Sequence, residues 1–127
     1  MNLQSIINSC AAILGAFITF AFGHWTESLT FLLTVIAIDI VSGMYASIRE
    51  GSGLNSAVGT VGLAKKGLIL LVILLGHRVD ILLGTDVVMG GAIYFYITNE
   101  LLSVMENYGR IGLPMPDKLR DVIAVLK

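Results

Sequence analysis

Three carboxylates stand inside otherwise apolar stretches, and their chemistry in that setting needs an explanation. Asp39 is the only charged residue in 28–48, and Asp80 and Glu100 lie within or at the ends of later apolar stretches. As a helix, 28–48 would span about 30 Å, the thickness of a membrane's hydrocarbon core. A carboxylate at that depth costs roughly 3 kcal/mol or more, so it indicates a functional site or a specific partner.

Asp39 shares one helix face with small residues, beginning with Ser42 and Gly43 at positions i+3 and i+4. Small residues allow a second helix to approach closely, so the carboxylate can meet a donor. Two interpretations stay open: a charge that lines a pore or gates assembly, and an ion pair or hydrogen bond within one copy. A protonated Asp39 is a further alternative. The basic candidates for a partner are Lys65, Lys66 and Arg78.

A second polar stripe runs from Asn99 to Asn107 near the end of the last apolar stretch. Two interpretations stay open. The stripe can be a hydrated face that lines a pore or an interface between copies, or it can be a helix end that frays into water. The candidate pore or assembly residues are therefore Asp39, Ser42, Gly43, Asp80, Glu100, Ser103 and Asn107.

Other chemistry finds little support in the residues. Cys10 has no partnered base, and His77 with Asp80 provides two ligands where a metal site needs three or four. We predict no catalytic residues, no cofactor and no metal, and therefore no enzyme. A net charge of −1 indicates no nucleic-acid partner.

The composition is that of a membrane protein. Hydrophobic residues make up 56% of the 127 residues, charged residues only 13%, and mean hydropathy is +0.88. Soluble domains are about 25% charged. Backbone groups in lipid are satisfied by helices, so we predict one all-α, polytopic helical bundle over 1–127. The predicted membrane spans are 6–22, 29–48, 63–83 and 87–105, and an amphipathic tail helix follows at 116–127.

The basic residues predict the topology. With four spans, seven of the eight Lys and Arg residues fall on one side, among them Lys127, and only Arg78 lies near the other. This bias places both termini in the cytoplasm. In a three-span alternative, the first segment lies on or outside the membrane. The N-terminus is then on the opposite side, and the rest of the topology is unchanged. The predicted membrane-surface anchors are Lys65, Lys66, Arg110 and Trp25.

Five segments in order resemble the toxin-secretion/phage-lysis holin family. They carry that family's Asp-x-x-x-Gly, Gly-x-x-(Lys/Arg)-Lys, apolar-Asp, Glu-x-x-Ser and Gly-Leu-Pro-x-Pro patterns. The segments are Leu33–Gly43, Ser56 with Gly62–Lys66, Val79–Asp80, Asn99–Asn107 and Gly112–Leu119. The resemblance runs from about Leu29 to Lys127, so the first span lies outside it.

This resemblance implies a function. Holins accumulate in the cytoplasmic membrane of the bacterial host, assemble laterally with copies of themselves, and open lesions in it. An endolysin then reaches the cell wall, with no direct binding between the two proteins, or a toxin leaves the cell. The alternative is a small oligomeric ion channel or transporter subunit that uses the intramembrane carboxylates.

Overall fold

The computed structural model describes residues 2–51 and 53–126, so Lys127 of the predicted basic set lies outside the described residues. The described chain is helical without strands, which confirms the all-α prediction. The five helices are α1 Leu3–Phe22, α2 Glu27–Arg49, α3 Ser56–Leu83, α4 Val88–Ile111 and α5 Asp117–Leu126.

Helices α1 to α4 are all longer than their apolar stretches predicted, and α3 and α4 extend furthest. Helix α3 begins seven residues before position 63, because the Asn55 side chain accepts hydrogen bonds from the amides of Ala57 and Val58. Such capping satisfies amides that a helix start leaves without partners. Helix α4 runs six residues past position 105 and ends at Gly112, whose φ of 85° is a left-handed conformation that glycine tolerates. The predicted boundaries followed hydropathy, whereas capping decides where these helices end.

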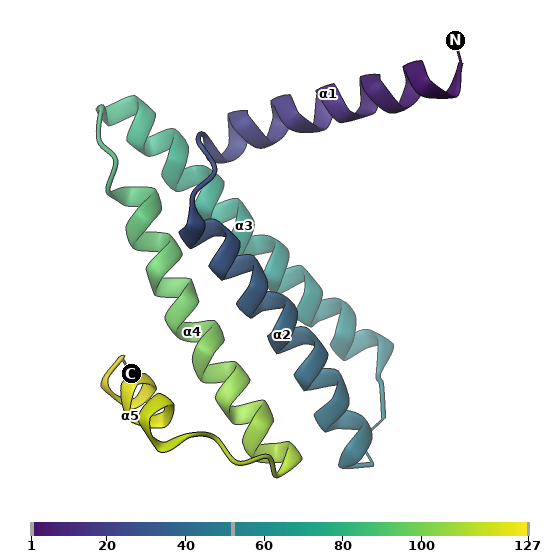
Figure 1. Ribbon diagram of the computed structural model, residues 1–127, viewed down its shortest axis with the longest axis vertical. Coiled ribbons are helices and arrows are strands. Elements are labelled where there is room, and N and C mark those ends of the chain that lie inside the picture. The colour runs from purple at the N-terminus through teal and green to yellow at the C-terminus, as the bar shows by residue number, and fades with distance from the viewer. Residues whose placement is uncertain (1, 52, 127) are drawn as a thin grey trace.

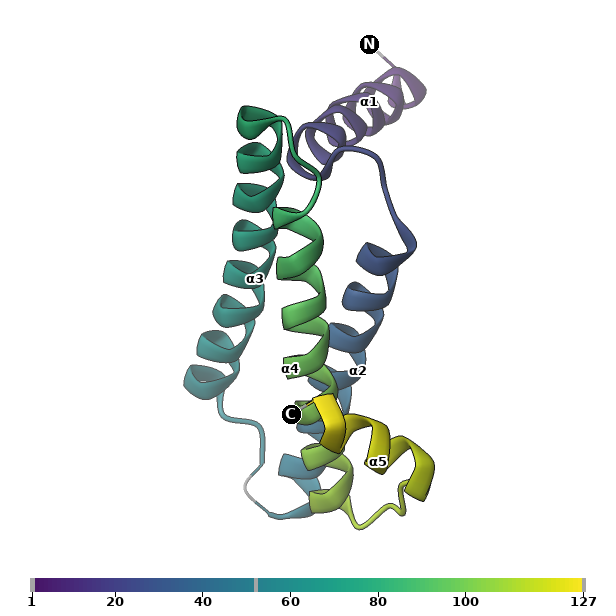
Figure 2. The same cartoon turned by 90° about the vertical axis from the view of Figure 1, so that its left-hand side faces the viewer.

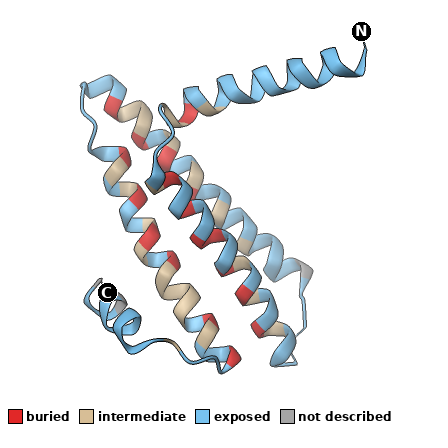
Figure 3. Cartoon of the chain, viewed as in Figure 1, coloured by how far each residue is buried: buried red, intermediate tan, exposed pale blue. Residues whose placement is uncertain are grey.

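Helices α2, α3 and α4 form a bundle in which α4 lies beside both others (Figures 1 and 2). Figure 3 shows buried segments along the facing sides of α2 and α4, and the buried core also includes residues of α3. The apolar part of this core is centred on Leu32, Ile73 and Ile93, which are almost completely buried. The bundle thereby holds together the three helices that carry Asp39, Asp80 and Glu100.

Helix α1 extends away from the bundle, and Figure 3 shows it exposed along nearly all of its length. Its last turn meets α3: the Arg78 guanidinium lies 4.5 Å from the centre of the Phe20 ring and donates to the Phe20 carbonyl at 3.4 Å. Gly23 ends α1 with φ of 67°, and a Cβ there would collide with the His77 ring. This junction fixes the C-terminal end of α1 against α3, and the rest of α1 makes little contact with the bundle.

Three helices of the described chain are long and apolar enough to cross a membrane, namely α1, α2 and α3. Helix α4, with 24 residues, is about 36 Å long and so has sufficient length. Its polar residues lower its hydropathy, so it is not among the three, although two of them, Glu100 and Asn107, are buried against the other helices. Four spans therefore remain a prediction.

Candidate functional site

The centre of the candidate site is the ammonium group of Lys66, which joins three helices. It donates to Asp39 Oδ2 on α2 at 2.5 Å and to both carboxylate oxygens of Glu100 on α4 at 2.8 Å. The two carboxylate side chains are 7% and 5% exposed, and the Lys66 side chain is 22% exposed. We call Asp39, Lys66 and Glu100 the ionic cluster.

Hydrogen bonds from α4 complete the surroundings of Asp39. The Ser103 hydroxyl donates to Asp39 Oδ1 at 2.6 Å, and the Asn107 amide donates to the same oxygen at 2.8 Å. Asn107 also donates to the Asp39 carbonyl at 3.1 Å and to the Ser42 hydroxyl at 3.0 Å. Within the described chain, no buried side-chain nitrogen or oxygen lacks a partner. The stripe on α2 and the stripe on α4 are therefore two halves of one network.

Gly43 allows this close approach of α2 and α4. A Cβ at Gly43 would lie 3.4 Å from the Asn107 side-chain nitrogen, at the limit of ordinary contact. The network thus lies against a glycine backbone, as expected where small residues bring two membrane helices together.

The ionic cluster lies near the middle of the bundle's length. Asp39 is twelve residues from the start of α2 and ten from its end, or about 18 Å and 15 Å along the axis. Two carboxylates share one ammonium, so the fully ionised cluster carries a net charge of −1. Buried charges are stable only when paired and hydrogen-bonded, and the shared ammonium with the α4 donors provides both. The arrangement can hold three helices together and can hold or exchange a proton.

Asp80 lies apart from the cluster, at the end of the bundle where α3 is connected to α4. Val87 provides no side-chain cap for α4, and Asp80 from α3 accepts hydrogen bonds from the amides of Val88 at 3.0 Å and Met89 at 2.9 Å. The Thr85 hydroxyl donates to the same carboxylate at 2.6 Å. The geometry is that of a helix cap that joins α3 to α4.

The predicted anchors occupy different places. Lys66, expected at the membrane surface, lies in the ionic cluster between the helices, whereas neighbouring Lys65 is exposed. Arg110 closes the far end of the bundle by donating from two guanidinium nitrogens to the Glu50 carboxylate, each at 2.9 Å. This contact with Arg110 lowers the pKa of Glu50, which lies just beyond α2. Trp25 lies at the α1–α2 link and donates to the Thr30 hydroxyl at 2.8 Å.

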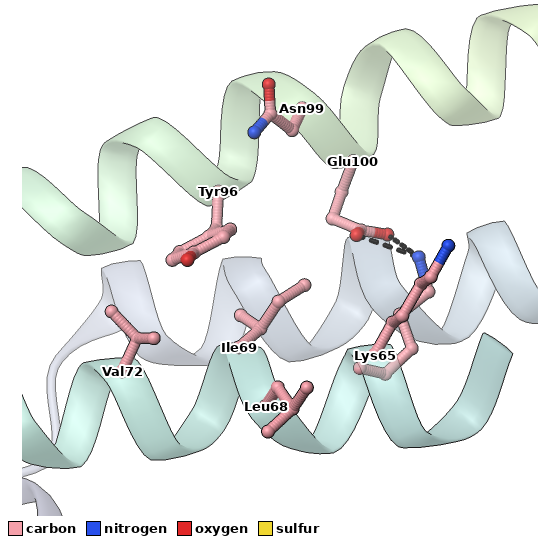
Figure 4. Close-up of a pocket in the computed structure, with 8 residues that line it drawn as sticks. Lys65, Leu68, Ile69, Val72, Tyr96, Asn99 and Glu100 are labelled. Atoms are coloured by element: carbon pink, nitrogen blue, oxygen red, sulfur yellow. Dashed lines mark hydrogen bonds and ion pairs between the residues drawn. The ribbon is translucent and has the colours of Figure 1, made fainter. Parts of the chain in front are cut away.

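A groove between α3 and α4 opens beside the ionic cluster, with a volume of 340 Å³. Figure 4 shows Glu100 reaching from α4 toward α3, with its contacts to the Lys66 ammonium dashed, and Lys65 standing beside them. Ile69 and Tyr96 continue the groove as an apolar surface. The sequence predicted neither the Glu50–Arg110 pair nor this groove, because both depend on how the helices pack.

Comparison with known sequences decides the family. The sequence pattern of the bacteriophage holin family matches residues 16–127. This chain belongs to the bacteriophage holin family. Among similar proteins of that kind, a probable holin of Bacillus phage phi105 is 29% identical over 85% of this chain and 79% of its own length. The match covers all three residues of the ionic cluster and confirms the family that the five sequence segments indicated.

Bacterial species also have relatives of this holin-family chain. An uncharacterized protein of Halalkalibacterium halodurans is 37% identical over 98% of this chain and 96% of its own length. An uncharacterized protein of Clostridium perfringens is 38% identical, again over 98% and 96%. No solved structure matches this chain. Family membership and the long apolar helices together make it a membrane protein.

Proposed function

We propose that this protein is a holin that assembles with copies of itself in the bacterial cytoplasmic membrane and opens lesions there. An endolysin then passes through these lesions to the cell wall, or a toxin leaves by the same route. The observation that carries the proposal is the ionic cluster: a member of the holin family holds its three bundle helices together with buried charges.

The cluster supports a mechanism with two states, a closed bundle in lipid and an opened form in which α4 has separated from α2 and α3. In one copy, Lys66 and the α4 donors satisfy the carboxylates, so the bundle can remain in lipid. Separation of α4 from α2 and α3 would expose charges that only water or another copy could satisfy. The cluster therefore sets the free energy that an assembling copy must supply before a lesion forms.

The distribution of basic residues supports the proposed orientation. Arg49 and Arg110 lie at one end of the bundle and Lys118 and Arg120 follow on α5, whereas Arg78 lies near the opposite end. Positive residues remain on the cytoplasmic side of bacterial membrane proteins. In the four-span arrangement, both termini therefore face the cytoplasm.

Regulated expression in bacteria tests the function. Cells that also produce an endolysin without a secretion signal are expected to grow normally, then stop abruptly and lyse. Asp39→Asn and Glu100→Gln are expected to shift the lysis time, because both change the charge of the cluster. Asp86→Asn is the matched control, since Asp86 is an exposed carboxylate in the α3–α4 loop.

Two outcomes would contradict the proposal. Lysis times unchanged by both cluster variants would remove the ionic cluster from the mechanism. Growth arrest with ion leakage but without escape of the folded endolysin would favour the alternative, a small oligomeric ion channel or transporter subunit.

A further inference from the structure

Two grooves along the bundle differ in the residues that line them. The α3–α4 groove contains Lys65, Lys66, Asn99 and Glu100 among its eight lining residues. The groove between α2 and α4 has a volume of 450 Å³ and is lined by apolar and hydroxyl residues without a charge. Of these two grooves, the one between α3 and α4 is therefore the one that carries charged groups.

Lys65 and Asn99 are exposed near the middle of the bundle rather than at its ends. Asn99 is eleven residues from the start of α4 and twelve from its end, or about 17 Å from each. Lys65 lies nine residues, about 14 Å, into α3. Neither side chain has a hydrogen bond or ion pair in the described part of the chain.

Two threonines of the bundle are satisfied by their own helices. The Thr34 hydroxyl donates to the Thr30 carbonyl at 2.8 Å, and the Thr98 hydroxyl donates to the Tyr94 carbonyl at 3.0 Å. Such hydroxyls tolerate lipid. A lysine can also bend toward the headgroups, but the amide of Asn99 is too short to leave the hydrocarbon. Among the described residues, the α3–α4 face therefore carries a lysine and an amide at this depth whose polar groups lipid would leave unsatisfied.

We infer that the α3–α4 groove is the wall that borders water in the open lesion, with Lys65 and Asn99 as its wetted residues. This inference rests on the proposed function. It differs from one of the two interpretations that the sequence left open, in which Asp39 lines the pore, because Asp39 and Ser42 are buried between α2 and α4. Water in the groove would also hydrate the outer side of the Lys66–Glu100 pair.

Cysteine labelling tests the assignment. Starting from Cys10→Ser, which removes the free thiol, single cysteines replace Lys65 or Asn99 on the groove. Leu71→Cys on α3 and Tyr94→Cys on α4 are matched controls at exposed positions outside the groove. Liposomes carrying each variant are treated with a charged, membrane-impermeant maleimide before and after they release an encapsulated fluorescent protein.

Both groove cysteines are expected to react at least about tenfold faster once release has begun, with the controls unchanged. Leu68→Cys, also on the groove, removes no charge and keeps the test decisive if Lys65→Cys is inactive. Release with labelling at the controls alone, at all positions alike, or at none would overturn the assignment while the proposed function stands. Failure of the wild-type protein to release the cargo would overturn the proposed function, and the wall with it.

Discussion

Replacing Lys66 by methionine should destabilise the bundle strongly, because it removes the cation that two buried carboxylates share. Lys66 lies 2.5 Å from Asp39 and 2.8 Å from Glu100. Methionine keeps the length and apolar stem of the side chain, so packing changes little. The adjacent Lys65 is exposed and without an ion pair in the described chain, which makes Lys65→Met the matched control.

The contact distances set the magnitude. At an effective dielectric constant of about 20, each unit-charge pair at roughly 2.8 Å attracts by about 6 kcal/mol. Desolvation of three buried ions, at several kcal/mol each, offsets most of this attraction. Removal of one partner from such a pair leaves a buried charge without the attraction that balanced its desolvation, and this costs about 3–5 kcal/mol. Proton uptake by a remaining carboxylate would limit the loss to that range.

The free energy of unfolding can be measured by titrating the protein from mild detergent into sodium dodecyl sulfate and following helix content. Lys66→Met is expected to lose about 3–5 kcal/mol, and Lys65→Met less than about 1 kcal/mol. Adding Glu100→Gln to Lys66→Met should recover about 1 kcal/mol or more, because coupled groups are not additive. Equal losses for the two lysine variants, or simple additivity in the double variant, would refute the shared-cation account.

Three further predictions concern other parts of the bundle. Gly76→Ala should destabilise by about 1–3 kcal/mol in the same titration, since its Cβ would lie 3.1 Å from the α4 backbone, whereas Gly67→Ala meets open space and should be neutral or stabilising. Asp80→Ala should speed hydrogen exchange at the two α4 amides that it caps while leaving the middle of α4 protected; unchanged exchange there would remove the capping role. The pKa of Glu50 is lowered by Arg110, so their contact should stabilise the bundle end above the ordinary pKa of a glutamate and be lost as pH falls through the lowered value. A carboxyl NMR titration of Glu50 would show this, and Arg110→Gln should return its pKa to the ordinary range.

Much of the fold could be predicted from the sequence because hydropathy is a local property. Runs of apolar residues predicted where the helices lie, and two of the carboxylates within them, Asp39 and Glu100, belong to the ionic cluster. Helix ends were less predictable, since Asn55 and Gly112 set them through capping rather than through hydropathy. The Asp80 cap of α4 depends on a turn between two helices, so no residue pattern within either helix revealed it.

The sequence by itself determined that this chain is an apolar, helical member of the holin family with costly carboxylates in its helices. Only the tertiary structure decided how those carboxylates are satisfied. The sequence offered Lys66 both as a membrane-surface anchor and as one of three candidate partners of Asp39. It is 27 residues from Asp39 and 34 from Glu100 along the chain, and the structure joins it to both. Spacing along one helix predicts which residues share a face, but the packing of α2, α3 and α4 decides which faces meet. That packing buries the Asp39 face and leaves Lys65 and Asn99 outside.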